Sequence, residues 1–258
     1  MKKESVGSYT GEEFWALHQK LVTGPDKYTK PIRVYCDVDG VIMPFINEQE
    51  DIDRLDGDAT IKVTTHHGFT NGLVNVVEGR FLYSKAVAAK LSEWSHREDV
   101  DFIWLTAWRF NAPYALDELL NIKSSGFMEW NNSPSDYNQV FKRIAIEDEQ
   151  KISPSKFIWL DDLANKTRDY AGGSYAVDSE PIPVFTRGEY NYEYDESFVE
   201  ELDENGYRIN EQEVTVTFVP KGEYIDPERY LSLTTDSYVG LSEKEISQVD
   251  AWLAKESS

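Results

Sequence analysis

The sequence has little cysteine and a shortage of basic side chains. A single cysteine, Cys36, among 258 residues excludes an intramolecular disulfide, which fits a reducing compartment. The 26 lysine and arginine residues are outnumbered by 47 aspartate and glutamate residues, so the formal net charge is −21. Nucleic acids and anionic membranes are bound mainly through basic side chains. The composition therefore argues against both as partners.

The sequence also lacks a long apolar run. No stretch approaches the length of about 18 apolar residues that a transmembrane helix needs. No apolar segment follows the N-terminal lysines, as it would in a secretory leader. Apolar residues still make up 40% of the chain, which is enough for one sizeable core. We therefore expect a soluble, cytoplasmic, globular protein with a single domain.

Two carboxylates follow a short apolar segment near the start of the chain. Apolar, β-branched and aromatic residues dominate residues 32–36, which predict a buried strand. Asp37 and Asp39 come directly after it, and Gly40 permits a sharp turn. Two carboxylates at the end of a buried strand are costly to desolvate without compensation. We interpret them as facing a cation and a phosphate; the alternative is an ordinary Asp-Gly turn.

Two more apolar segments end in the same way. Residues 102–105 lead into Thr106, and residues 157–160 lead into Asp161 and Asp162. Amphipathic or capped segments that predict helices lie between them, over residues 84–95, 113–120 and 137–150. Alternation of short apolar strands with helices is typical of an α/β fold with a central parallel sheet.

The carboxyl ends of parallel strands lie along one edge of the sheet, which is where such sheets bind ligands. The four aspartates and the threonine hydroxyl should therefore converge. The carboxylates would repel one another there unless a cation were present. Their hard oxygen atoms suit Mg²⁺, which takes a few carboxylates and keeps its waters.

At this point the sequence resembles the haloacid dehalogenase-like (HAD) superfamily of phosphohydrolases. Asp37-Val38-Asp39-Gly40-Val41 resembles the first of its four motifs, DxDG[VT]. Thr106 resembles the second motif, and the Asp161-Asp162 pair resembles the fourth. Lys142 is our choice for the third, because it lies on the predicted helix before the fourth motif. Lys123, Lys151 and Lys156 are its competitors. The resemblance covers about residues 30–170.

The resemblance implies a Rossmannoid three-layer fold and a Mg²⁺-dependent phosphomonoester hydrolase. Asp37 would attack phosphorus and form an aspartyl phosphate, with Asp39 as general acid and then general base. Thr106 with its neighbour Ala107, and Lys142, would bind the phosphoryl group of a small phosphorylated substrate.

The resemblance also implies the metal ligands. The side chain of Asp37 and the backbone carbonyl of Asp39 would hold Mg²⁺. Asp161 or Asp162 would complete the site, and we favour Asp161.

We predict that the HAD-like core covers about residues 30–185, and we assign the remaining segments around it. Residues 10–21 and 242–254 predict helices with capping boxes, the second of which closes the fold. Residues 46–82 predict a small β-hairpin flap, which leaves no room for a large cap domain. Residues 186–228 are acidic and rich in tyrosine, and we read them as an insertion. An alternative function follows from this insertion: a non-catalytic HAD-like binding module that uses it to hold a partner.

Overall fold

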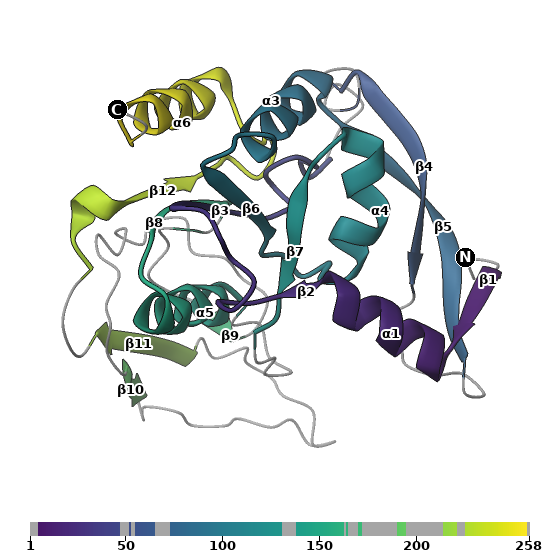
Figure 1. Ribbon diagram of the computed structural model, residues 1–258, viewed down its shortest axis with the longest axis horizontal. Helices are drawn as coiled ribbons and strands as arrows, with labels where there is room; N and C mark the ends of the chain where they lie inside the picture. The colour runs from purple at the N-terminus through teal and green to yellow at the C-terminus, as the bar shows by residue number, and fades with distance from the viewer. Residues whose placement is uncertain are drawn as a thin grey trace, which may run out of the picture. The chain divides into compact units, whose positions relative to one another are not determined.

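The computed structural model divides the chain into two compact units. The first comprises residues 1–129, 155–162 and 230–258, and the second comprises residues 130–154 and 163–229 (Figure 1). The structure describes residues 5–46, 52, 55–64, 73–130, 138–162, 164, 170–171, 190–194, 214–220 and 225–256.

The first unit contains a six-stranded sheet in which all neighbouring strands run parallel. Its strands are β2 (Val22–Thr23), β3 (Ile32–Cys36), β6 (Val100–Trp104), β7 (Ser124–Met128), β8 (Lys156–Asp161) and β12 (Tyr230–Thr234). They lie in the order β12-β8-β3-β6-β7-β2. The predicted α/β fold with a central parallel sheet is confirmed, and the topology is consistent with a Rossmann-like fold.

Both faces of the central strands are buried, because all five residues of β3 and of β6 are shielded from solvent. Val34 and Cys36 point into an apolar core on one face of the sheet. Tyr35 on the other face meets Phe157 edge to face at 5.9 Å, and Phe157 stacks on Tyr230 at 5.3 Å. Burial on both faces explains why these strands are mostly apolar and do not alternate between apolar and polar residues.

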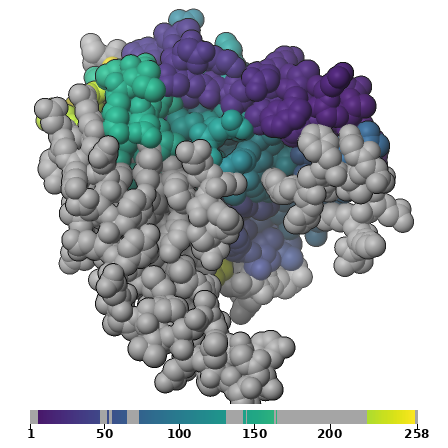
Figure 2. Space-filling model, turned by 90° about the horizontal axis from the view of Figure 1, so that it is seen from below, coloured from purple at the N-terminus to yellow at the C-terminus, as the bar shows by residue number. Residues whose placement is uncertain are grey.

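Helices α3 (Lys85–Ser95), α4 (Asn111–Leu120) and α6 (Glu243–Glu256) contribute apolar side chains to the core on the first face. Ser84 caps α3, and Glu245 accepts hydrogen bonds from the backbone N–H and the hydroxyl of Ser242 at the start of α6. Helix α1 (Gly11–Leu21) begins with the predicted capping box of Thr10 and Glu13. Its residues lie in the purple band at the surface in Figure 2, where Trp15 is half-exposed.

The predicted hairpin is present but belongs to a larger sheet. Strands β4 (Gly57–Thr64) and β5 (Leu73–Tyr83) pair in antiparallel fashion, and β1 (Ser5–Thr10) adds to β5 as a third strand. The turn at residues 65–72 lies outside the described residues. Helix α4 packs between this sheet and β7 (Figure 1). Asn111 joins α4 to β4 by accepting hydrogen bonds from the backbone N–H and the hydroxyl of Thr64, at 2.8 and 2.9 Å.

The second unit contains helix α5 (Asn138–Ile152), the 3₁₀ helix η1 (Pro227–Arg229) and a small antiparallel sheet. Its strands are β9 (Tyr170–Ala171), β10 (Tyr190–Tyr194) and β11 (Val214–Pro220) in the order β10-β11-β9. Strand β9, which falls within the core predicted up to residue 185, pairs with β11 of this small sheet. Most of the predicted insertion 186–228 lies outside the described residues.

Candidate active site

The strand order reverses next to β3. From β3 the chain proceeds to β6 and β7 on one side, then crosses to β8 and β12 on the other. A reversal of this kind opens a crevice at the carboxyl ends of the two strands that flank it, and open α/β sheets bind their ligands there. In this protein the flanking strands are β3 and β8, which lead into Asp37 and into Asp161-Asp162.

Three carboxylates meet at this point. Asp37, Asp161 and Asp162 each offer an oxygen atom, and these atoms all lie within 4.8 Å of one another. The three residues are only 5%, 0% and 6% exposed. Sheet pairing brings them together, because the backbone N–H of Asp37 donates to the carbonyl of Leu160 at 2.9 Å. The predicted convergence of these aspartates is therefore present in the structure.

The charge of this cluster fits a divalent cation. At an effective dielectric of about 20, two like charges about 5 Å apart repel by about 3 kcal/mol, and burial adds a desolvation cost. A cation among the three oxygens would reverse the sign of these interactions. Carboxylate oxygens at this density suit Mg²⁺. A hard divalent cation such as Mg²⁺ is therefore a group that this donor set could hold.

A glycine seats Asp162 beside the turn that follows β3. Gly40 has φ +68°, and a Cβ atom built on it would lie 2.5 Å from Cβ of Asp162. The backbone N–H of Gly40 donates to Met43 at 2.9 Å, which closes the turn. Only glycine meets both requirements here, a left-handed backbone and no side chain.

Sequence reasoning missed the loop that follows β12. The hydroxyl of Ser237 donates to Oδ2 of Asp162 at 2.7 Å, and the hydroxyl of Thr235 donates to the carbonyl of Gly40 at 2.6 Å. The backbone N–H of Phe45 donates to the carbonyl of Ser237 at 2.8 Å. This loop thus fixes both the turn after β3 and one carboxylate of the cluster. The available signal was the alternating segment 230–234, which has the pattern of a strand and ends in polar residues.

Thr106 lies at the end of the neighbouring strand, fully buried. Leu105 before it donates its N–H to the carbonyl of Cys36 at 2.9 Å, which continues the sheet to the level of Asp37. Ala107 follows Thr106 in the turn and is exposed. Arg109 then adopts a left-handed backbone with φ +47°, and burial lowers the pKa of its guanidinium while nearby Glu129 opposes that shift.

Asp39 is not one of the three clustered carboxylates. Its Oδ2 accepts a hydrogen bond of 3.0 Å from the indole Nε1–H of Trp108. The sequence pattern did not indicate this partner, because tryptophan carries no motif signal of its own.

Lys142 belongs to the second unit. It lies on α5 and is 3% exposed, and its Nζ lies 6.0 Å from the centroid of the Trp130 ring. A solvated helix lysine is thereby excluded. The competing Lys123, Lys151 and Lys156 are all exposed. Lys142 is the buried member of the four.

Comparison with known proteins adds no relative. No family model, no curated protein and no solved structure matches the chain. Within the described part of the chain, no helix combines the length and apolar character needed to cross a membrane.

Proposed function

We propose that this protein is a Mg²⁺-dependent phosphomonoester hydrolase of the HAD-like type. The observation that carries the proposal is the cluster of Asp37, Asp161 and Asp162, buried within 4.8 Å at the strand-order reversal. Bound there, Mg²⁺ would supply positive charge that offsets the repulsion between an anionic nucleophile and an anionic phosphate. The backbone carbonyl of Asp39 is the further ligand that the family resemblance implies.

The chemistry assigned to the chain's own residues has two steps. A carboxylate oxygen of Asp37 attacks phosphorus, the bond to the leaving oxygen breaks, and that oxygen takes a proton from the Asp39 carboxyl group. A water molecule then attacks phosphorus, gives a proton to Asp39, and releases inorganic phosphate. Asp37 is regenerated as a carboxylate and Asp39 as a carboxylic acid, so atoms and charges balance.

The remaining residues act on the phosphoryl group. The hydroxyl of Thr106 would donate a hydrogen bond to a phosphoryl oxygen, with Ala107 beside it. The family resemblance assigns to Lys142 the neutralisation of charge that develops in transfer.

The test compares the wild type with Asp37→Asn on 4-nitrophenyl phosphate, with Mg²⁺ and with EDTA. Hydrolysis should need both Mg²⁺ and Asp37, and the variant should lose at least about 10³-fold in kcat because the nucleophile is gone. Asp58→Asn is the matched control, since Asp58 forms an exposed pair with Arg80 at 2.9 Å. Full activity in Asp37→Asn, or the absence of both hydrolysis and Mg²⁺ binding by calorimetry, contradicts the proposal.

A further inference from the structure

Trp108 connects the candidate general acid to the rigid part of the first unit. Its indole Nε1–H donates to Oδ2 of Asp39 at 3.0 Å, and its backbone N–H donates to the hydroxyl of Thr106 at 3.3 Å. The indole also meets Phe81 edge to face, with ring centroids 5.9 Å apart. Phe81 is fully buried on β5.

These contacts leave the indole little freedom. Phe81 stacks in turn on Tyr83, with ring centroids 5.3 Å apart. Both residues belong to β5, so the indole of Trp108 packs against side chains of the antiparallel sheet. The backbone of Trp108 is tied to Thr106 and, through its carbonyl, to the N–H of Asn111 at 2.9 Å. A side chain locked by packing can hold a partner in one orientation, which is what catalytic groups require.

The indole nitrogen is a donor only, so it takes no part in moving protons. A hydrogen bond from it can orient a carboxyl group without competing for the proton that this group transfers. A histidine, serine or water at the same place could accept as well as donate.

We propose that Trp108 is a positioning residue that holds the Asp39 carboxyl group in the orientation from which it protonates the leaving oxygen. This inference rests on the proposed function. It assigns to Trp108 a role in the cleavage step and none in binding the phosphoryl group.

The leaving group provides the test, because esters differ in how much they need an acid. The 4-nitrophenolate ion leaves readily without a proton, whereas the alkoxide from benzyl phosphate needs one. Both esters carry one aromatic ring, so they differ little in size. Loss of orientation at Asp39 should therefore slow benzyl phosphate far more than 4-nitrophenyl phosphate.

Trp108→Phe removes the N–H and keeps an aromatic ring against Phe81. We expect kcat/KM for benzyl phosphate to fall by about 10- to 100-fold, a part of the roughly 10²- to 10⁴-fold that general acid–base catalysis contributes, and kcat/KM for 4-nitrophenyl phosphate to change by less than about 3-fold. The ratio kcat/KM reports the steps up to release of the alcohol and so excludes the later attack of water, for which Asp39 is the base. Asp39→Asn should show the same selectivity with a larger loss.

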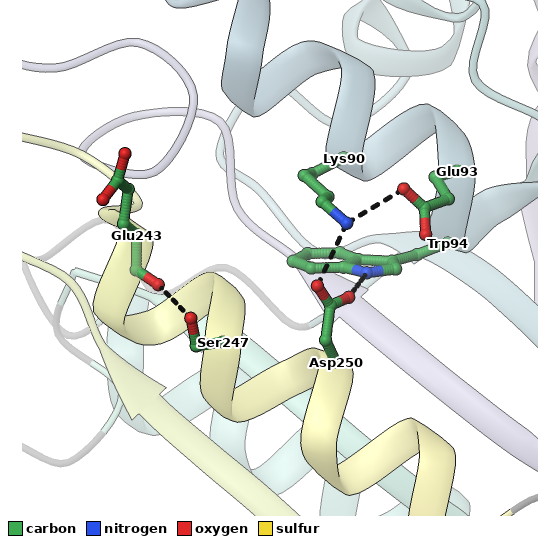
Figure 3. A network of polar contacts seen from close by, with 6 residues as sticks. All are labelled: Lys90, Glu93, Trp94, Glu243, Ser247 and Asp250. Atoms are coloured by element: carbon green, nitrogen blue, oxygen red, sulfur yellow. Dashed lines mark hydrogen bonds and ion pairs between the residues drawn. The ribbon is translucent and has the colours of Figure 1, made fainter.

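Trp94→Phe is the matched control. Trp94 also donates its indole N–H to an aspartate, Asp250, at 2.8 Å, but this pair joins α3 to α6 (Figure 3). The control should alter stability and leave the ratio of the two kcat/KM values unchanged. An equal loss on both esters in Trp108→Phe would indicate a merely structural role and overturn the inference.

A second readout does not depend on turnover. In a ¹⁵N spectrum of the tryptophan side chains, Asp39→Ala should shift the Nε1–H resonance of Trp108 upfield and leave that of Trp94 in place. An unmoved Trp108 resonance overturns the inference even if the enzyme works as proposed. Conversely, full activity of Asp37→Asn would refute the proposed function while leaving this contact measurable, so the two failures are distinguishable.

Discussion

Ser237 donates a hydrogen bond of 2.7 Å to Oδ2 of Asp162, and the two residues are 75 positions apart in the sequence. The bond leaves Asp162 less freedom to turn away from Asp37 and Asp161. Partners of this kind behind a metal ligand orient it, and their removal typically weakens metal binding by about 10- to 100-fold.

Ser237→Ala should therefore bind Mg²⁺ about 10-fold more weakly while remaining folded. Isothermal titration calorimetry measures the affinity directly. Ser247→Ala is the control, because the Ser247 hydroxyl donates only to the carbonyl of Glu243 within α6 (Figure 3). An unchanged Mg²⁺ affinity in Ser237→Ala would show that Asp162 needs no orienting partner or binds no metal.

Gly40→Ala should destabilise the protein and weaken Mg²⁺ binding together. The left-handed backbone costs a residue with a side chain roughly 1–2 kcal/mol, and the new methyl group would push Asp162 away. Urea denaturation and calorimetry should show both losses. Gly7→Ala is the control, since a Cβ atom there would lie 4.0 Å from its nearest neighbour, Cβ of Val76. A stable Gly40→Ala protein with normal Mg²⁺ affinity would contradict the close approach to Asp162.

The effect of Asp161→Asn on the free energy of unfolding should depend on whether Mg²⁺ is present. In EDTA the variant should be more stable than the wild type by about 1 kcal/mol or more, because one of three mutually repelling carboxylates is neutral. At 100 times its dissociation constant, Mg²⁺ should stabilise the wild type by about 2.7 kcal/mol and the variant by less. Denaturation curves with and without Mg²⁺ test this. An equal Mg²⁺ response in both proteins would exclude Asp161 as a ligand.

Asp117 should make stability depend on pH. Burial raises its pKa to about 6, although the hydroxyl of Ser124 and the indole N–H of Trp104 both donate to it. Its pKa in the unfolded chain is near 3.8. The folded state therefore binds the proton more tightly, so this contribution is fully present below about pH 3.8 and is lost as the pH rises through 6.

The shift corresponds to about 3 kcal/mol, and Asp117→Asn, which cannot ionise, should not lose it. The free energy of unfolding of the wild type relative to Asp117→Asn should fall by up to this amount between pH 4 and pH 7. Urea denaturation at several pH values checks the slope. A difference that stays flat, or rises with pH, would contradict a raised pKa.

The sequence by itself determined three of the six strands of the central sheet, together with the strand ends that build the candidate site. Strands β3, β6 and β8 are short and apolar, so their positions follow from local pattern. Parallel pairing then places Asp37, Thr106 and Asp161 along one edge, because the chain direction alone decides where each strand ends. The capping boxes of α1 and α6 were predictable for the same reason, because each depends on two residues three positions apart.

Only the tertiary structure decided what surrounds these groups. The addition of β1 to β5 and of β12 to β8, the bond from Ser237 to Asp162, and the bond from Trp108 to Asp39 all join segments far apart in the chain. No local periodicity encodes such pairs, because their energy comes from contacts that exist only after the sheet has formed. The sequence alone thus placed the aspartates at one edge, and the fold supplied the partners that hold them there.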